Sequence, residues 1–422
     1  MGKGVSVLLL LLAIGCATPK KKIVKVVEKG LNGAFYDHQF TGVLIVDALS
    51  KDTLYSKNSK KYFTPASNTK IFTLYTALKA LPQHIPALKY LERKDTLYFE
   101  GTGDPSFLHT ALKDSTALHF LKQKEHLVWV TGNFKDGRFG PGWSWEDYDV
   151  RYAPERSALP LYGNLATLFN VDGSPRAIPT YFRDSIVPEM ADVNRLEDRN
   201  LFYYDAGRTD TLQVPFKATN KTVHGMLQLA LDKPVKLSKE MPPGPKSTLY
   251  GSPADSLYTL LMQDSDNFIA EQLLLLAASV WTDTLQSGLA RTRVLDGPLG
   301  DLPQMPRWVD GSGLSRYNLF TPQSMVHVLD KLLKEVPRER LFRIFPAGGV
   351  SGTLKDGYAS KDGPYIFAKS GSLGNNYCLS GYLMTRSGKT LLFSFMNNHY
   401  RKPTAQVKER MQRFFEHIRD TY

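Results

Sequence analysis

The residues most able to do chemistry in this chain are a serine and a lysine that stand three positions apart. Ser67 precedes Lys70, after Pro65 and ahead of an almost entirely apolar run at 71–81. Residues i and i+3 share one face of a helix, so we expect the hydroxyl and the amine to point the same way. A serine hydroxyl needs a neighbouring base to become a good nucleophile. A neutral Lys70 would supply that base.

The same spacing has an ordinary explanation. A serine at a helix entry often caps the first turn, and a lysine often runs along apolar surface to reach water. Two further groups follow in the chain, Ser265-x-Asn267 and Lys369-Ser370-Gly371. Taken alone, the second group is typical of a helix cap and the third of a plain turn. All three in order favour a single catalytic site.

Each group has a role in that interpretation. Burial against an apolar helix and a second cation, Lys369, would both disfavour the charged form of Lys70. Ser265 would pass the proton on to the leaving amine. Asn267 would hold Lys70 and the amide of the substrate in register.

A pair of backbone donors and a carboxylate site complete the predicted centre. The oxyanion of an acyl transfer needs preorganised N–H donors, and the candidates are those of Ser67 and Ser372. The hydroxyl groups of Ser370 and Ser372, next to Gly371 and beside Lys369, would bind a terminal carboxylate. The nine histidines show no close ligand spacing, so no metal site is expected.

The ordered trio resembles the Ser-x-x-Lys, Ser-x-Asn and Lys-Thr-Gly motifs of class A β-lactamases and penicillin-binding proteins. From about residue 30 onward, the chain resembles the low-molecular-mass class C penicillin-binding proteins, the D-alanyl-D-alanine carboxypeptidase/endopeptidase family. Besides the trio, the matching stretches are 103–105, 140–145, 152–159, 265–271, 310–316, 369–373 and 380–382. A long gap between the first two motifs is typical of this family, whereas β-lactamases have a short one. Ser370 stands where threonine is more usual and keeps the hydroxyl.

The resemblance implies a serine DD-peptidase that acts on peptidoglycan stem peptides through an acyl-enzyme on Ser67. It also implies covalent inhibition by β-lactams and no cofactor. Carboxypeptidase and endopeptidase action both stay open. Two alternatives remain: a β-lactamase or esterase on the same fold, distinguished by fast deacylation, and a catalytically silent lipid-anchored protein that binds peptidoglycan.

The elements around these motifs predict an α+β fold. Strands are expected at Phe40–Asp47 and Thr53–Ser56, then at 377–385 and 390–396, and apolar residues fall on one face of a helix at Thr404–Arg419. This pattern predicts a penicillin-binding transpeptidase-type domain, an antiparallel sheet covered by helices, built from 31–85 and 245–422. Short strands and frequent turns predict a long, mostly β inserted region at 86–244, with one or two accessory lobes.

The first residues have the composition of an export signal. Lys3 precedes a run of about ten residues at 5–14 that is apolar except for Ser6, too short to cross a membrane but typical of a secretory signal. The run ends Ala13-Ile14-Gly15-Cys16, which resembles the bacterial lipobox with alanine where leucine is usual. We therefore predict a signal peptide at 1–15, lipidation of Cys16 and a lysine-rich tether at 16–30. The alternative is an ordinary signal peptide with an incidental cysteine.

Charge and cysteine content limit the kinds of partner and the location that we expect for this protein. The net charge of +12, from 53 Lys and Arg against 41 Asp and Glu, favours an anionic partner such as a membrane surface. No basic run with interleaved aromatic residues is present, so nucleic acid is not expected. The only cysteines are Cys16 and Cys378, and the second is predicted to be a small buried residue. We expect an exported, periplasmic protein anchored to the membrane by its N-terminal lipid.

Overall fold

The computed structural model describes residues 27–28, 31 and 33–422. The predicted signal peptide, Cys16 and the tether up to residue 26 lie outside the described residues. Within the part of the chain that is described, no helix is both long enough and apolar enough to cross a membrane.

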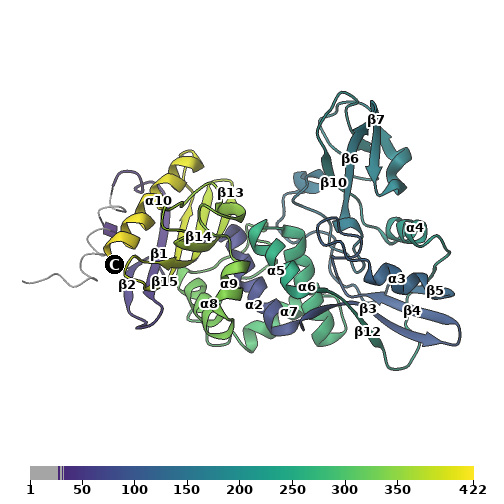
Figure 1. The fold of residues 1–422 in the computed structure, drawn as a ribbon, viewed down its shortest axis with the longest axis horizontal. Coiled ribbons are helices and arrows are strands. Elements are labelled where there is room, and N and C mark those ends of the chain that lie inside the picture. Colours follow the sequence, from purple (N-terminus) through teal and green to yellow (C-terminus); the bar gives the residue numbers. More distant parts are fainter. Residues whose placement is uncertain (1–26, 29–30, 32) are drawn as a thin grey trace, which may run out of the picture.

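A five-stranded antiparallel sheet forms one end of the elongated molecule (Figure 1). Its strand order is β13-β14-β15-β1-β2. Residues of β1 and β15 are almost all buried, because helices cover both faces of the sheet, and strands in that setting become continuous apolar runs. The bounds are β1 Phe40–Asp47, β2 Thr53–Lys57, β13 Ile366–Leu373, β14 Asn376–Met384 and β15 Thr390–Asn398.

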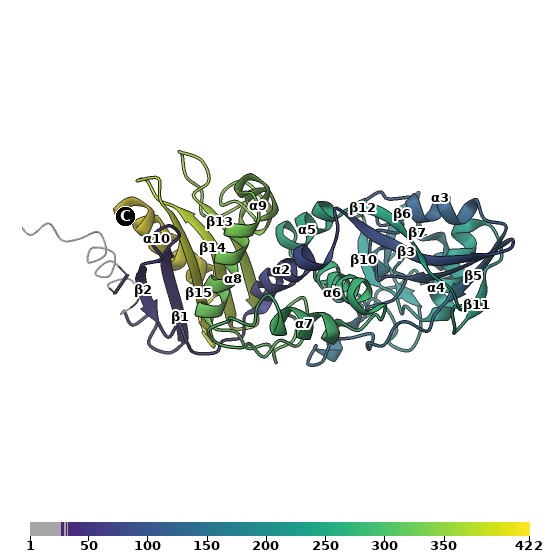
Figure 2. The ribbon, with the colours of Figure 1, turned by 90° about the horizontal axis from the view of Figure 1, so that it is seen from below.

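One face of this sheet is covered by the C-terminal helix α10 (Thr404–Thr421) and the other by α8 (Pro322–Glu335). Helix α2 (Lys70–Ala80) packs against α8 on the side away from the sheet, as Figure 2 shows. The predicted apolar face of α10 is confirmed: Val407, Met411, Phe414, Phe415 and Ile418 are all buried. Thr321 caps α8 by accepting a hydrogen bond from the backbone of Ser324.

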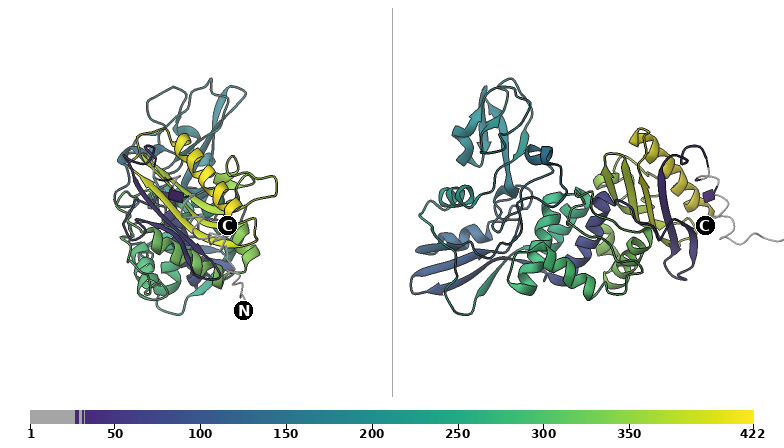
Figure 3. Two further views of the ribbon diagram at one scale, coloured as in Figure 1. Left: turned by 90° about the vertical axis from the view of Figure 1, so that its left-hand side faces the viewer. Right: turned by 180° about the vertical axis from the view of Figure 1, so that it is seen from behind.

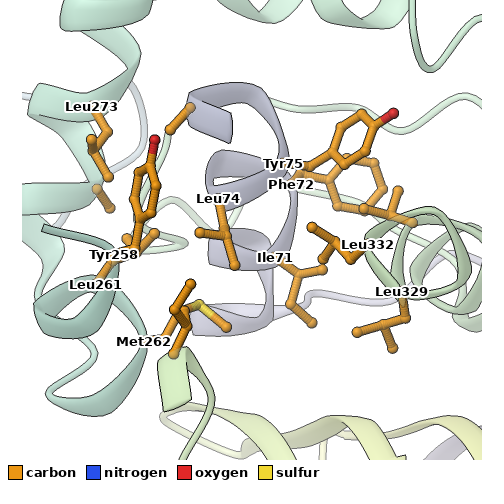
Figure 4. Close-up of a cluster of buried hydrophobic side chains, with 14 of the residues drawn as sticks. Ile71, Phe72, Leu74, Tyr75, Tyr258, Leu261, Met262, Leu273, Leu329 and Leu332 are labelled. Atoms are coloured by element: carbon orange, nitrogen blue, oxygen red, sulfur yellow. The ribbon is translucent and has the colours of Figure 1, made fainter. Parts of the chain in front are cut away.

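Helix α2 runs through the middle of a helical cluster. Leu74 points toward Leu261 and Leu273, while Ile71 points toward Leu329 (Figure 4), and all five of these side chains are buried. Truncating one such leucine to alanine costs about 2–5 kcal/mol, so this core fixes the position of α2 firmly. The other helices of the cluster are α5 (Ala254–Gln263), α6 (Asn267–Thr282), α7 (Ser287–Asp296) and α9 (Arg338–Ile344).

The inserted region lies beyond these helices and contains two larger sheets. One has the order β11-β5-β4-β3-β12 and packs against α3 and α4, and the other has the order β10-β6-β7 and stands apart as a lobe (Figure 3). A short pair, β8 and β9, accompanies them. The bounds are β3 His84–Arg93, β4 Thr96–Gly101, α3 Thr116–Lys122, β5 His126–Val130, β6 Leu165–Val171, β7 Ser174–Ile178, β8 Ile186–Val187, β9 Phe202–Tyr203, β10 Leu212–Pro215, α4 Asn220–Leu231, β11 Lys236–Ser238 and β12 Ser247–Pro253. Single 3-10 turns lie at Ala66–Thr69, Trp145–Asp149, Tyr162–Asn164, Thr180–Ser185 and Gly352–Leu354.

The chain enters and leaves the inserted region through two paired strands. β3 begins at His84, and β12, which pairs with it antiparallel, ends at Pro253. The sheet of the inserted region therefore uses residues on both sides of the range 86–244 inferred from turn signals. Backbone pairing between entry and exit strands is not visible in local composition.

Candidate active site

Ser67 and Lys70 lie at the entry of α2. Ser67 is in the 3-10 turn Ala66–Thr69, and Lys70 is the first residue of the helix. The Lys70 Nζ donates hydrogen bonds to Ser67 Oγ at 3.0 Å, to Asn267 Oδ1 at 2.6 Å and to the carbonyl of Ser312 at 2.7 Å. Lys70 is 0% exposed, so it does not extend to water. Neither the turn nor α2 has a side-chain cap, so the ordinary capping explanation for Ser67 is wrong.

The second motif faces the first across the helix entry. Asp266, between the two predicted residues, caps α6 by accepting from the backbone N of Ile269 at 2.9 Å. Asn267 is therefore free to contact Lys70, and its Nδ2 donates to the carbonyl of Tyr152 in the inserted region at 2.9 Å. Ser265 has φ +57°, a conformation that non-glycine residues rarely adopt and that clusters at functional sites.

The third motif lies inside β13, not in a turn. Lys369 Nζ donates to Ser265 Oγ and to the carbonyl of Ser370, both at 2.8 Å. The hydroxyl of Ser370 donates to Thr353 Oγ1 at 2.8 Å. A Cβ at Gly371 would lie 2.9 Å from the backbone N of Ser67. Glycine is therefore needed for the close approach of β13 to the Ser67 turn.

The open edge of β13 carries the predicted oxyanion donor. The backbone N of Ala368 donates to the carbonyl of Pro346 at 3.0 Å, on the side away from β14. Backbone groups two residues apart in a strand face the same way, so the N–H groups of Ser370 and Ser372 also face this edge. The N–H of Ser372 thus lies on the edge that borders the Ser67 turn.

The two buried lysines differ in their pKa values. Burial lowers the pKa of Lys70 to about 8, although the carboxylates of Asp310, Asp266 and Glu271 oppose that shift. Burial, and secondly the charge of Lys70, hold the pKa of Lys369 well below its usual value. From the sequence we expected the charge of Lys369 to depress the pKa of Lys70. The structure brings three carboxylates to Lys70, and their charge opposes the effect of burial on its pKa, whereas the charge of Lys70 adds to the effect of burial on the pKa of Lys369. The expected effect of Lys369 on Lys70 stays a prediction.

A tight loop after residue 309 packs next to Lys70. The buried carboxylate of Asp310 accepts from the backbone N of Gly313 at 2.9 Å and of Ser315 at 2.7 Å, and from Trp143 Nε1 of the inserted region at 2.8 Å. Gly313 has φ +86°, and a Cβ there would lie 2.0 Å from the carbonyl of Ala66. This loop therefore packs against the Ser67 turn and brings the Ser312 carbonyl to Lys70.

Three contacts of the candidate site were not predicted from the sequence. Asn68 Nδ2 donates to the carbonyl of Lys369 at 2.8 Å, which joins the first motif to the third. Glu271 is buried on α6, four residues after Asn267, and this spacing on one helix face was a usable signal. The Ser312 contact uses a backbone carbonyl, for which no side-chain pattern exists.

A cleft of about 720 Å³ opens beside the three motifs. Ser265 and Asn267 line one side, His109 and Tyr152 of the inserted region line another, and Thr353 closes it near Ser370. In the part of the chain that the structure describes, no three His, Cys, Asp or Glu side chains are grouped to hold a metal ion. The arrangement has the parts for nucleophilic acyl transfer by a serine with a lysine base.

The chain is similar to curated proteins and to solved structures of the same fold. The chain is 23% identical over 414 residues to the D-alanyl-D-alanine carboxypeptidase DacB of Haemophilus influenzae, and the match covers 86% of each chain. The crystal structure of penicillin binding protein 4 (dacB) from the same organism superposes with a TM-score of 0.76 at 22% identity, over 94% of this chain and 99% of that one. A second structure of that protein, complexed with a β-lactam, gives 0.66 at 21% identity, over 93% and 97%.

One family model matches most of the described chain. The sequence pattern of the D-Ala-D-Ala carboxypeptidase 3 (S13) family matches residues 26–234 and 248–418. The predicted α+β fold and the predicted class of enzyme, a serine-type D-Ala-D-Ala carboxypeptidase, are confirmed. The chain belongs to the D-Ala-D-Ala carboxypeptidase 3 (S13) family.

Proposed function

We propose that this enzyme cleaves the terminal D-Ala-D-Ala bond of peptidoglycan stem peptides through an ester on Ser67. Ser67 Oγ attacks the carbonyl carbon of the penultimate D-alanine while Lys70 takes the hydroxyl proton. The bond from that carbon to the nitrogen of the terminal D-alanine breaks, and the proton reaches this nitrogen through Lys70 and Ser265. Water then attacks the ester, releases the shortened peptide and restores the Ser67 hydroxyl.

One observation carries this proposal. The buried amine of Lys70 lies 3.0 Å from Ser67 Oγ, and its pKa of about 8 leaves a useful neutral fraction near neutral pH. The N–H groups of Ser67 and Ser372 are the proposed oxyanion donors. Ser370, Gly371 and Ser372 are the proposed contacts for the terminal carboxylate, beside Lys369. β-Lactams, which present a strained amide to the same nucleophile, are proposed as covalent inhibitors.

The decisive experiment is acylation by a fluorescent penicillin, followed by intact-protein mass measurement. We expect one label per chain, no label on Ser67→Ala, and release of D-alanine from a peptide ending in D-Ala-D-Ala that is lost in the same variant. Ser387→Ala, in the exposed hairpin turn between β14 and β15, is the matched control and should label normally. An unchanged mass for the wild-type chain after penicillin treatment would overturn the proposal.

Endopeptidase action belongs to the same proposal. The cleft beside Ser265 and Asn267 extends over residues of the inserted region such as Tyr152, and we propose that it accommodates a branched, cross-linked stem peptide. Digests of isolated sacculi should lose cross-linked dimers in the presence of the enzyme and keep them with Ser67→Ala. Loss of terminal D-alanine without loss of dimers would restrict the activity to carboxypeptidase.

We also propose that the protein is exported to the periplasm and held at a membrane by lipid on Cys16. The support is the sequence of residues 1–16. Metabolic labelling with an alkyne fatty acid should mark the wild-type protein and leave Cys16→Ser unmarked. Equal labelling of both proteins would contradict lipidation at this residue.

A further inference from the structure

A chain of buried polar contacts leads from the proposed base to the inserted region. The Lys70 Nζ donates to the carbonyl of Ser312 at 2.7 Å, and the backbone N of Ser312 donates to Glu271 Oε1 at 2.8 Å. The other carboxylate oxygen, Glu271 Oε2, lies 3.5 Å from Arg156 Nη1. Lys70, Glu271 and Ser312 are 0% exposed, and Arg156 is 4% exposed. The chain is therefore shielded from water along its whole length.

Arg156 is held rigidly by its own part of the molecule. Its Nε donates to the carbonyl of Gly137 at 3.1 Å and its Nη2 to that of Phe139 at 2.8 Å. Its Nη1 also lies 3.2 Å from Asp136 Oδ2. All of these partners are in the inserted region, so the guanidinium is a fixed positive group presented to α6.

Both ends of this chain lie among other charges. Lys70 faces Asp310 from the loop, Asp266 and Glu271 from the entry and body of α6, and Lys369 from β13. Glu271 faces Asp310, Arg156 and, from α7, Arg291. A buried carboxylate without a partner is costly, and removal of one member of such a pair typically destabilises a protein by about 3–5 kcal/mol. Burial, and secondly the charge of Asp310, raise the pKa of Glu271, and the charge of Arg156 opposes that shift and so favours the ionised carboxylate.

We infer that Glu271 is a positioning residue for Lys70, and that the inserted region acts on the catalytic base by anchoring Glu271 through Arg156. Glu271 seats the Ser312 carbonyl against the amine by holding the Ser312 N–H. Its negative charge also favours the ammonium form of Lys70 and so limits how far burial depresses the pKa of that group. This inference rests on the proposed function, in which Lys70 deprotonates Ser67.

The first test is the pH dependence of acylation in Glu271→Gln. Glutamine keeps an oxygen that can accept from the Ser312 N–H but removes the charge. The pKa of Lys70 should then fall, and the acidic limb of the acylation profile should move to lower pH by about one unit. Glu100→Gln is the matched control, because Glu100 is also buried but pairs with Lys246, the residue before β12. Its limb should coincide with that of the wild type.

The second test is rescue of an Arg156 variant. Arg156→Met leaves Glu271 as an unpaired buried charge, so both the melting temperature and the acylation rate should fall. Adding Glu271→Gln removes the charge that needed compensation and should restore much of both losses, whereas Arg156→Lys should retain most of the wild-type rate.

The outcomes distinguish a failure of the proposed function from a failure of the proposed role of Glu271. If the wild-type chain is not acylated by penicillin, the proposed function fails. If it is acylated but the acidic limb of Glu271→Gln matches the wild type or moves to higher pH, only this inference fails. An Arg156→Met rate that Glu271→Gln does not improve would overturn the anchoring part.

Discussion

The surroundings of the two buried lysines differ in a way that separates their roles. Lys70, at the entry of α2, lies among three carboxylates and donates to three oxygens, one of them on Ser67. Lys369, within β13, donates to Ser265 Oγ and its own strand, and its pKa is lowered further by the charge of Lys70. Burial alone therefore does not define a base. The acidic groups beside Lys70 oppose the effect of burial on its pKa, which is about 8, whereas the charge of Lys70 adds to the effect of burial on the pKa of Lys369.

This difference predicts that Lys70 is the residue whose loss matters most. Lys70→Met keeps the volume of the buried side chain but removes the base, so acylation by penicillin should slow by about 1000-fold or more. Stopped-flow measurement with a fluorescent penicillin would give the rate. Lys79→Met is the control on the same helix, where Lys79 pairs with Glu335 at the surface, and it should acylate normally. A Lys70→Met rate within tenfold of the wild type would assign the base elsewhere.

Loss of Lys369 should have the next largest effect and a different character. Lys369→Met removes the donor to Ser265 and the neighbour of the carboxylate site, so acylation should slow by about 100-fold. The acidic limb of the profile should stay near pH 8, because the pKa of Lys70 is set by burial and by the carboxylates of Asp310, Asp266 and Glu271. Retention of the wild-type acylation rate would contradict a role for Lys369 in acylation. A large movement of the limb would show that its charge does lower the pKa of Lys70.

The pH profile of the wild type tests the same comparison directly. Protonated Lys70 cannot accept the Ser67 proton, so the acylation rate should rise about tenfold per pH unit below its pKa and level off above about 8. Acylation rates between pH 5 and 10 in buffers of constant ionic strength would define the midpoint. A profile that is flat from pH 5 upward would mean that Lys70 is neutral throughout this range.

The hydrogen bond from Lys70 to Asn267 should contribute less than either lysine. A hydrogen bond to a charged group is worth about 1.5–3 kcal/mol, so Asn267→Ala should slow acylation by about 10- to 100-fold. The bond of 2.6 Å to the Lys70 amine and the bond to the Tyr152 carbonyl are both lost. Thermal unfolding should be measured alongside, since a rate loss without a loss of stability assigns the effect to the position of Lys70.

The smallest effect should come from Ser370→Thr, at the residue that follows Lys369 in β13. The hydroxyl that bonds to Thr353 is kept, and Ser370 is partly exposed. We expect acylation rates and D-alanine release within about twofold of the wild type. A loss of more than tenfold would show that the edge of β13 fits serine alone.

Much of this protein is determined by local sequence. The burial of α2 and α6 follows from apolar runs that leave a helix no polar face, and the strands around β1 and β15 follow from their β-branched and aromatic content. The three motifs carry the side chains for the chemistry. Their order in the chain identified the family pattern, because Ser-x-x-Lys, Ser-x-Asn and Lys-Ser-Gly seldom occur together in this order by chance.

What the tertiary structure decided is which groups surround the reacting atoms. The Ser312 carbonyl reaches Lys70 through its backbone, and Arg156 comes from the inserted region, over a hundred positions from Glu271 along the chain. The pKa of Lys70 depends on where Asp310, Asp266 and Glu271 lie in space, and the pKa of Lys369 depends on its burial beside Lys70. Electrostatic effects follow distance and burial, which sequence separation does not encode. The sequence therefore predicts Ser67 as the nucleophile with two lysines beside it, and only the fold shows which charged groups surround each lysine.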